Sequence, residues 1–255
     1  MTDAELLESV TQIARAAGEL ILRVYSTDFS VRGKGDASPV TEADEQAESL
    51  ILAALGELTP NTPVVAEESV AAGCVPDIGD GSGRFWLVDP LDGTKEFISR
   101  NGEFTVNIAL IERGEPVLGV VLAPALGRLF AGSRGNGAWV QDQSGRRSIR
   151  CRAIPEAGAT VVASRSHGDA AALDAFLSGT KVANLVSAGS SLKLCLVASG
   201  EADMYPRLGR TMEWDIAAGH AVLAAAGGRV QRLDDGQPLL YGKPGFDNPH
   251  FVAAG

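Results

Sequence analysis

The sequence FWLVDPLDGTKEF, residues 85–97, predicts a buried strand, a turn and the start of a short helix. Its first four residues are apolar and turn residues follow them, which is typical of a strand covered on both faces of a sheet. Pro90 has no N–H group and cannot extend a central ladder, so we expect the chain to turn after Asp89. Gly93 allows close approach of the backbone, and Thr94 is expected to begin the helix.

Two carboxylates, Asp89 and Asp92, therefore come next to a helix N-terminus. The free N–H groups and the positive dipole end of a helix N-terminus attract phosphate. Carboxylates bind hard cations such as Mg²⁺, and such cations assist phosphate chemistry. The stretch thus predicts metal-assisted chemistry on a phosphate.

The composition is that of an ordinary globular protein. The 255 residues are 45% hydrophobic and 21% charged, enough for one large domain or two small ones. The formal net charge of −10 argues against a general nucleic-acid binder, which needs basic patches to offset backbone phosphates. A small anionic substrate stays compatible with this charge if metal ions and a few local Lys and Arg residues reverse the field at the site.

The cysteines and the hydrophobic runs bear on location. Three cysteines are too few and too scattered for a disulfide framework or a zinc cluster, which is typical of a reducing compartment. The first residues lack the basic and apolar segments of a signal peptide, and no run approaches the roughly 20 apolar residues of a membrane span. We therefore expect a cytoplasmic protein without a transmembrane segment.

Hydrophobic periodicity predicts an N-terminal α+β domain over residues 1–155. Two amphipathic helices are expected at about residues 4–25 and 41–58. Two hairpins, over residues 105–123 and 129–141, predict a mainly antiparallel sheet. This domain is expected to carry the main metal site.

Residues 156–255 show a different pattern, in which strand-like and helical segments alternate. Alternation of this kind predicts a C-terminal α/β domain, which we expect to bind the substrate. The active site is expected in the cleft between the two domains.

Three separated motifs resemble the inositol monophosphatase superfamily, whose members are Mg²⁺-dependent, lithium-sensitive phosphatases. The motifs are Glu67-Glu68-Ser69, the run from Asp89 to Thr94, and WDIAAG at residues 214–219, and they occur in the order expected for that family. The resemblance implies a sugar-phosphatase fold, a layered αβαβα sandwich that combines α+β and α/β character.

Other segments resemble one branch of this superfamily, the CysQ-type 3′(2′),5′-bisphosphate nucleotidases of sulfur assimilation. They are WLVDPLDGTKEFI at residues 86–98, GSSLK at residues 189–193 and YPR at residues 205–207. The resemblance implies hydrolysis of the 3′-phosphate of adenosine 3′,5′-bisphosphate to give AMP and phosphate. It also implies activity on the sulfated precursor of that nucleotide, PAPS.

The resemblance assigns a metal site for two or three Mg²⁺ ions. Asp89 would bridge two ions; Glu67 and the Leu91 carbonyl would bind the first, and Asp92 and Asp215 the second. Two metal ions about 3.5–4 Å apart can activate a water and neutralise the leaving oxygen in one displacement. The alternative interpretation is that each carboxylate is a helix cap or a turn residue, as Asp before Gly-Thr commonly is.

The resemblance also pairs Asp44 with Thr94 as the catalytic groups that orient and deprotonate the attacking water. Asp44 lies in TEAD, residues 41–44, at the predicted start of the second helix. Its alternative role is that of a first-turn carboxylate favoured by the helix dipole. The backbone N–H groups of Gly93 and Thr94 are expected to hold the phosphate.

The sequence LDGT at residues 91–94 also resembles the haloacid-dehalogenase signature D-x-D-G-T. That chemistry needs a nucleophilic aspartate two positions before Asp92, where this chain has Pro90, and Asp89 is one position away. A covalent aspartyl-phosphate mechanism is therefore not expected.

Residues of the C-terminal half are expected to select the substrate. Simple inositol phosphatases carry glutamate where this chain has Arg207, whose guanidinium would suit a second phosphate through a bidentate contact. Lys193 would add a second positive charge, and Gly189 would let the backbone approach the ligand.

Arg165 and His167 follow a predicted strand and would lie near the nucleoside. The resemblance adds three further substrate contacts: Ser190, Ser191 and Asp215. The alternatives are a solvated arginine and a histidine that only caps a strand.

Two other functions stay open at this point. One is an inositol or other sugar monophosphatase, and the other is a non-catalytic protein that senses metal or phosphate. The complete set of carboxylates argues against the second. The family resembled includes monomers, homodimers and members peripheral to the cytoplasmic face of the inner membrane, so the sequence leaves the oligomeric state open.

Overall fold

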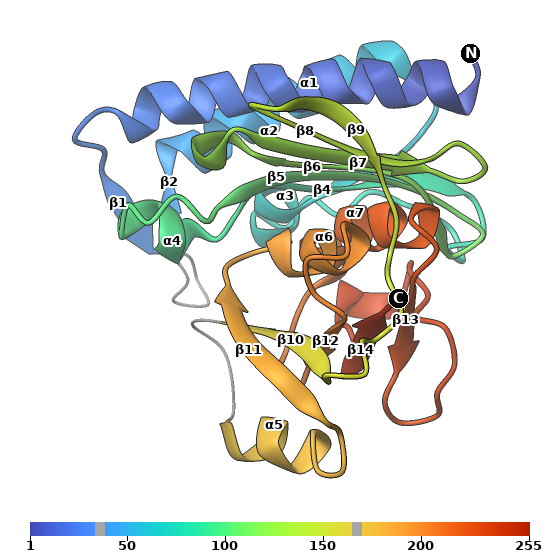
Figure 1. Ribbon diagram of the computed structural model, residues 1–255. Helices are drawn as coiled ribbons and strands as arrows, with labels where there is room; N and C mark the ends of the chain where they lie inside the picture. Colours follow the sequence, from blue (N-terminus) through green and yellow to red (C-terminus); the bar gives the residue numbers. More distant parts are fainter. Residues whose placement is uncertain (34–38, 165–169) are drawn as a thin grey trace.

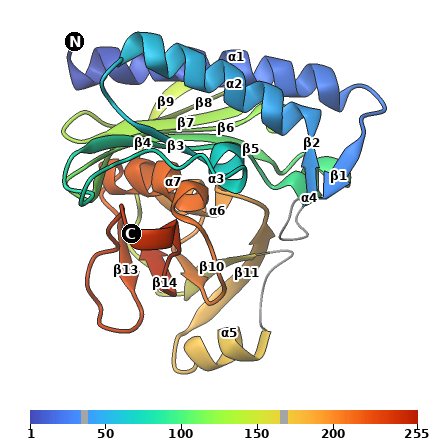
Figure 2. The same cartoon turned by 180° about the vertical axis from the view of Figure 1, so that it is seen from behind.

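The computed structural model describes residues 1–33, 39–164 and 170–255 and consists of three helical layers separated by two sheets (Figure 1). An outer pair of helices, α1 and α2, lies side by side on one face of the larger sheet (Figure 2). A second pair, α6 and α7, lies between the sheets, and α5 lies beyond the smaller one. The bounds of these helices are α1 Asp3–Tyr25, α2 Glu42–Leu58, α5 Ala170–Phe176, α6 Leu192–Ala198 and α7 Glu213–Ala225. The predicted αβαβα sandwich is confirmed.

The larger sheet has seven strands in sequential order. They are β3 (Val64–Ala66), β4 (Arg84–Asp92), β5 (Thr105–Glu112), β6 (Glu115–Ala123), β7 (Arg128–Ser133), β8 (Gly137–Asp142) and β9 (Gly145–Ile149). Only the pair β3–β4 is parallel, and both predicted hairpins are confirmed. Strand β9 was not predicted, because its sequence is polar and all but its last residue are exposed.

The smaller sheet has five strands in the order β11-β10-β12-β14-β13. They are β10 (Ala159–Ser164), β11 (Val182–Ala188), β12 (Met204–Arg207), β13 (Arg229–Arg232) and β14 (Phe251–Ala254). The first three are parallel, as the alternating pattern predicted, whereas β14 is antiparallel to both of its neighbours. The last two strands were not predicted.

Short elements complete the chain. They are β1 (Val31–Gly33), β2 (Pro39–Thr41), α3 (Glu67–Ala71), α4 (Thr94–Ile98) and two 3₁₀ turns, Pro124–Leu126 and Pro244–Phe246. No helix in the described part of the chain is long and apolar enough to cross a membrane.

The first helix begins at a capping box, in which Thr2 accepts from the Glu5 N–H and the Glu5 carboxylate accepts from Thr2. Its buried residues recur every three or four positions and face the sheet, as the periodicity predicted.

Side chains of strand β5 point alternately to the two faces of the larger sheet and so contribute to two separate hydrophobic cores. Val106, Ile108 and Leu110 pack toward α1 and α2. The intervening odd-numbered residues, among them Ala109, pack toward α7.

Glycines allow α7 to lie very close to the larger sheet. A Cβ atom on Gly119 of β6 would come within 2.3 Å of the Ala218 carbonyl oxygen, so a side chain there would push the helix away. This close contact holds Asp215, in the first turn of α7, beside the end of β4.

The expected boundary between residues 155 and 156 falls between β9 and β10, where the chain changes sheet. However, α7 packs on strands β4 to β7, and one hydrophobic core contains residues from both parts. The division into two domains therefore stays a prediction.

Strand β4 does not end at Asp89, so the prediction of a turn there is wrong. Asp89 pairs with Asn107, and Asp92 pairs with Thr105. Between these two pairs β4 advances by three residues while β5 advances by two. This is a β-bulge, and Pro90 is tolerated because its missing N–H falls in the interrupted ladder.

Candidate active site

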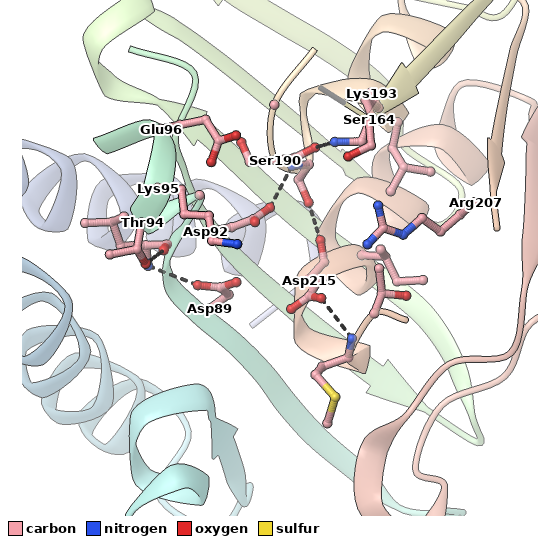
Figure 3. Close-up of a pocket in the computed structure, with 18 of the residues that line it drawn as sticks. Asp89, Asp92, Thr94, Lys95, Glu96, Ser164, Ser190, Lys193, Arg207 and Asp215 are labelled. Carbon is pink, nitrogen blue, oxygen red and sulfur yellow. Dashed lines mark hydrogen bonds between the residues drawn. The ribbon is translucent and has the colours of Figure 1, made fainter. Parts of the chain in front are cut away.

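A pocket of about 400 Å³ lies between the end of β4 and the first turns of α6 and α7 (Figure 3). Most of the predicted site residues line it. They are Glu67, Asp89, Leu91, Asp92, Gly93, Thr94, Gly189, Ser190, Ser191, Lys193, Arg207 and Asp215. Asp44 lies behind Thr94, and Arg165 and His167 lie outside the described residues.

The four carboxylates come from three elements: Glu67 from α3, Asp89 and Asp92 from β4, and Asp215 from α7. Asp89 is 1% exposed, and its Oδ1 accepts a hydrogen bond of 3.1 Å from the Leu91 N–H across the bulge. Asp92 Oδ2 accepts from the Ser191 N–H at 2.7 Å. Asp215 accepts from the Met212 N–H at 2.8 Å and thereby caps α7. The alternative interpretation therefore describes the local contacts of Asp89 and Asp215, whereas the contact of Asp92 is made with a residue 99 positions away; neither excludes a second role.

Burial and mutual repulsion raise the pKa values of two of these carboxylates. Burial raises the pKa of Asp92 to about 6, although the positive charge of Lys193 opposes the shift. The pKa of Asp215 is raised well above its ordinary value by burial and by the negative charges of Asp92 and Glu67. Carboxylates that repel one another in a pocket are stabilised when a cation binds between them.

The donor chemistry of the pocket fits Mg²⁺, which prefers carboxylate and carbonyl oxygens. Among the described residues, no three His, Cys, Asp or Glu side chains are arranged as a ready-made metal cage. Mg²⁺ does not require one, because it keeps several waters and is commonly held by one or two carboxylates together with substrate phosphates.

The structure brings Asp44 and Thr94 together. Thr94 Oγ1 donates to Asp44 Oδ1 at 3.2 Å. Asp44 Oδ2 accepts from the N–H and the hydroxyl of Thr41, at 2.8 and 2.6 Å, in the capping box of α2. Asp44 is 1% exposed. One carboxylate thus caps a helix and orients the threonine that faces the pocket.

Glu48 was missed by the sequence analysis. It is buried on α2, and its carboxylate accepts from the N–H groups of Glu68 and Ser69, each at 2.8 Å. These contacts hold the N-terminus of α3, whose first residue is Glu67. The available signal was its spacing, because a residue four positions after Asp44 lies on the same helix face.

The turn before α6 is held by two carboxylates. The Gly189 N–H donates to Glu103 Oε2 at 2.8 Å, and the Ser191 N–H donates to Asp92. Ser190 between them has a positive φ of 37°, a strained conformation for a residue with a side chain. A Cβ atom on Gly189 would lie 2.8 Å from the Glu103 carbonyl oxygen, which explains the glycine. Glu103 was not predicted, and no local pattern marks it.

Lys193 and Arg207 lie at the other end of the pocket from Asp89 (Figure 3). Lys193 is 5% exposed; its Nζ donates to the Ser190 carbonyl, and burial lowers its pKa to about 8. Arg207 is 8% exposed, and it directs Nε to the Gly209 carbonyl at 3.2 Å and Nη2 to the Arg210 carbonyl at 2.7 Å. The Arg207 guanidinium is therefore buried rather than solvated. Some of its N–H groups donate to carbonyl groups of its own loop, and these are not available to a ligand.

Two cations on the pocket wall were not predicted. Lys95 and Arg210 both line the pocket and are exposed, and Arg210 forms a surface ion pair of 2.7 Å with Asp247. Lys95 lies beside Asp92, whereas Lys193 and Arg207 lie away from Asp89 and give that end of the pocket a positive character (Figure 3).

The layered fold and a carboxylate-lined pocket of this kind define a class of metal-dependent phosphatases. The chain belongs to the inositol monophosphatase family, whose model matches residues 3–251. It is 48% identical over 250 residues to the 3′(2′),5′-bisphosphate nucleotidase CysQ of Escherichia coli K12, covering 96% of this chain and 98% of the relative. The corresponding protein of Buchnera aphidicola is 42% identical, with coverage of 98% and 94%.

Solved structures agree with these sequence matches. The crystal structure of CysQ from Bacteroides thetaiotaomicron superposes with a TM-score of 0.81 at 36% identity, covering 98% of this chain and 97% of that one. The extragenic suppressor protein suhB from Bartonella henselae superposes with a TM-score of 0.79 at 29% identity, covering 98% and 93%. The predicted family and its nucleotidase branch are confirmed by these similarities.

Proposed function

We propose that this chain is a 3′(2′),5′-bisphosphate nucleotidase, which removes the 3′-phosphate of adenosine 3′,5′-bisphosphate to give AMP and phosphate. The observation that carries the proposal is that Lys193 and Arg207 lie at the other end of one pocket from Asp89 (Figure 3). A substrate with two phosphates matches both ends, with the reacting phosphate at the carboxylates and the other at the cations. The 48% identity to CysQ over 250 residues supports the same substrate class.

We further propose that the site holds two or three Mg²⁺ ions. Asp89 would bridge, with Glu67 and the Leu91 carbonyl on one side and Asp92 and Asp215 on the other. Bound ions of this kind supply the charge that activates the attacking water and neutralises the leaving oxygen. Repulsion between the buried carboxylates supports this assignment, because a cation relieves it.

Asp44 and Thr94 are proposed to handle the proton of the attacking water. Because Thr94 Oγ1 donates its own proton to Asp44 Oδ1, its lone pairs remain to accept a proton from the water. The proton released from the water thus passes to Thr94 as the Thr94 proton passes to Asp44. The N–H groups of Gly93 and Thr94 are proposed to hold the reacting phosphate.

The other end of the substrate is proposed to meet Lys193, Arg207 and the turn of residues 189–191. The buried ammonium of Lys193 and the part of the Arg207 fork that does not hold its loop would bind the second phosphate. Contacts of Arg165 and His167 with the nucleoside belong to the same proposal.

A phosphate-release assay with Mg²⁺, with and without lithium, tests the proposal. Adenosine 3′,5′-bisphosphate should be the preferred substrate, PAPS should also be cleaved, and lithium should inhibit. Asp89→Asn should abolish release, because it removes the bridging charge. A strong preference for inositol 1-phosphate would instead identify a sugar monophosphatase, and the absence of any release would favour a non-catalytic sensor.

The expected cytoplasmic location and the choice between monomer and homodimer also remain proposals. Cell fractionation and light scattering of the purified chain test them, and recovery of the chain with membranes would indicate the peripheral location.

A further inference from the structure

A buried asparagine lies behind the carboxylate of Asp92. Asn107 of β5 is 0% exposed and pairs across the sheet with Asp89. Its Nδ2 donates to Asp92 Oδ2 at 3.3 Å. Its Oδ1 is buried and has no hydrogen-bond partner among the described residues. The reverse amide orientation would direct an oxygen at a carboxylate oxygen, which is repulsive, so the donor faces Asp92.

The position of Asn107 is unusual for the face of the strand on which it lies. Ala109 and Ile111, the next residues on the same face, are buried apolar residues of the core around α7. An amide with an unpaired oxygen costs folding free energy there, since a buried polar group without its partners loses its hydration. A buried asparagine in this place therefore requires a reason other than packing.

The contact with Asp92 supplies that reason. Asp92 Oδ2 receives two donors, the Ser191 N–H at 2.7 Å and Asn107 Nδ2 at 3.3 Å. One donor comes from the turn before α6 and the other from β5, so together they fix the rotation of the carboxylate. With Oδ2 held in this way, Oδ1 is the oxygen that the carboxylate can offer to a cation in the pocket.

We propose that Asn107 is a positioning residue of the metal site, which orients Asp92 so that Oδ1 is presented to the cation. The inference rests on the proposed function, because it takes Asp92 as a metal ligand. Partners that hydrogen-bond to metal ligands typically change metal affinity by about 10–100-fold when they are removed. Asn107 itself contacts neither the metal nor the substrate in this proposal.

The strand provides a matched control in Thr105. It lies two residues before Asn107 on the same face, it is also 0% exposed, and its hydroxyl oxygen is likewise buried without a partner in the described part of the chain. Thr105→Val and Asn107→Leu therefore both remove a buried polar group from one face of β5, but only the second removes a donor to Asp92.

The experiment measures binding of Mn²⁺, a paramagnetic substitute for Mg²⁺, to the full chain without substrate by electron paramagnetic resonance. Asn107→Leu should weaken binding by about 10–100-fold, and Thr105→Val should change it less than about twofold. In an Asp92→Asn background, adding Asn107→Leu should cause no further loss, because the effect passes through Asp92. Circular dichroism and thermal melting establish that each variant is folded. Asn107→Ser, whose side chain is too short to reach Asp92, serves as a second variant with the same expected weakening.

The outcomes separate the inference from the proposed function. If the Asp92→Asn variant binds Mn²⁺ as tightly as the unchanged chain, the proposed metal site is wrong. If Asp92→Asn weakens binding but a folded Asn107→Leu or Asn107→Ser variant does not, only the role of Asn107 is wrong. Equal weakening by Thr105→Val, or additive loss in the double variant, also overturns it, because either result indicates a general effect of packing.

Discussion

Thr94 Oγ1 donates a hydrogen bond of 3.2 Å to Asp44 Oδ1 and so joins α4 to α2 across 50 residues of sequence. The other oxygen of Asp44 caps α2 through Thr41. The helix cap thereby fixes the carboxylate that orients the threonine in the pocket. The Asp44 carboxylate therefore both caps α2 and takes part in the proposed proton transfer.

Asp44→Asn should lower kcat by about 10²–10⁴-fold with little change in KM, because the amide does not accept the proton from Thr94. Steady-state kinetics with the bisphosphate substrate measures the change. Thr41→Ala is the control: it removes the cap, with an expected loss of about 1 kcal/mol of stability, and should affect kcat far less. Equal loss of kcat in both variants would indicate that Asp44 has only a structural role.

Arg207→Glu should reduce kcat/KM for adenosine 3′,5′-bisphosphate by about 10–100-fold, the loss of one charge-assisted contact. The loss for a simple phosphate monoester should be smaller, because the monoester lacks the second phosphate. Arg210→Glu makes the same charge change at an exposed position on the pocket wall, and we expect a smaller effect. A similar loss for both substrates in Arg207→Glu would show that Arg207 mainly holds its loop through the Gly209 and Arg210 carbonyls.

Asp92→Asn should stabilise the metal-free protein at pH 8 by roughly 1–3 kcal/mol, because burial raises the pKa of Asp92 to about 6. A raised pKa means that the folded state disfavours the charged form. The stabilising effect should therefore shrink as pH falls from above 6 toward 4, where the wild-type carboxyl becomes protonated in the folded state. Mg²⁺ should raise the melting temperature of the wild type more than that of the variant. Denaturant titrations of the metal-free proteins measure the first effect, and thermal melting with and without Mg²⁺ measures the second. A less stable metal-free variant would contradict the first, and an equal shift in melting temperature would contradict the second.

His220 should make the protein sensitive to mild acid. It lies on α7, its Nδ1 is 2.8 Å from the Tyr241 hydroxyl, and burial lowers its pKa to about 3. In the unfolded chain the pKa is about 6.5, so between pH 6.5 and 3 only the unfolded state takes up the proton. Stability is lost as pH falls through this window, by up to about 1.4 kcal/mol for each pH unit. Comparison with His220→Gln by urea denaturation at pH 7, 5.5 and 4 isolates this contribution, and parallel pH profiles would contradict it.

The local elements of the fold could be predicted because their signals lie along the chain. The first helix follows from apolar residues at three- and four-residue steps, and the hairpins of β5–β6 and β7–β8 follow from apolar strands joined by Gly-containing turns. Strands β9, β13 and β14 have no such signal. They are short or exposed, and they exist because neighbouring strands offer them backbone hydrogen bonds.

The sequence by itself determined which chemical groups this protein has: the carboxylates of Glu67, Asp89, Asp92 and Asp215, in an order that resembles a phosphatase family. Only the tertiary structure decided what holds them. Glu103 meets Gly189 across 86 residues, and Asn107 meets Asp92 across a bulge that the sequence analysis interpreted as a turn. Such contacts depend on strand register and on the packing of α6 and α7 against the sheet. These are long-range properties, and a local pattern of residues does not contain them.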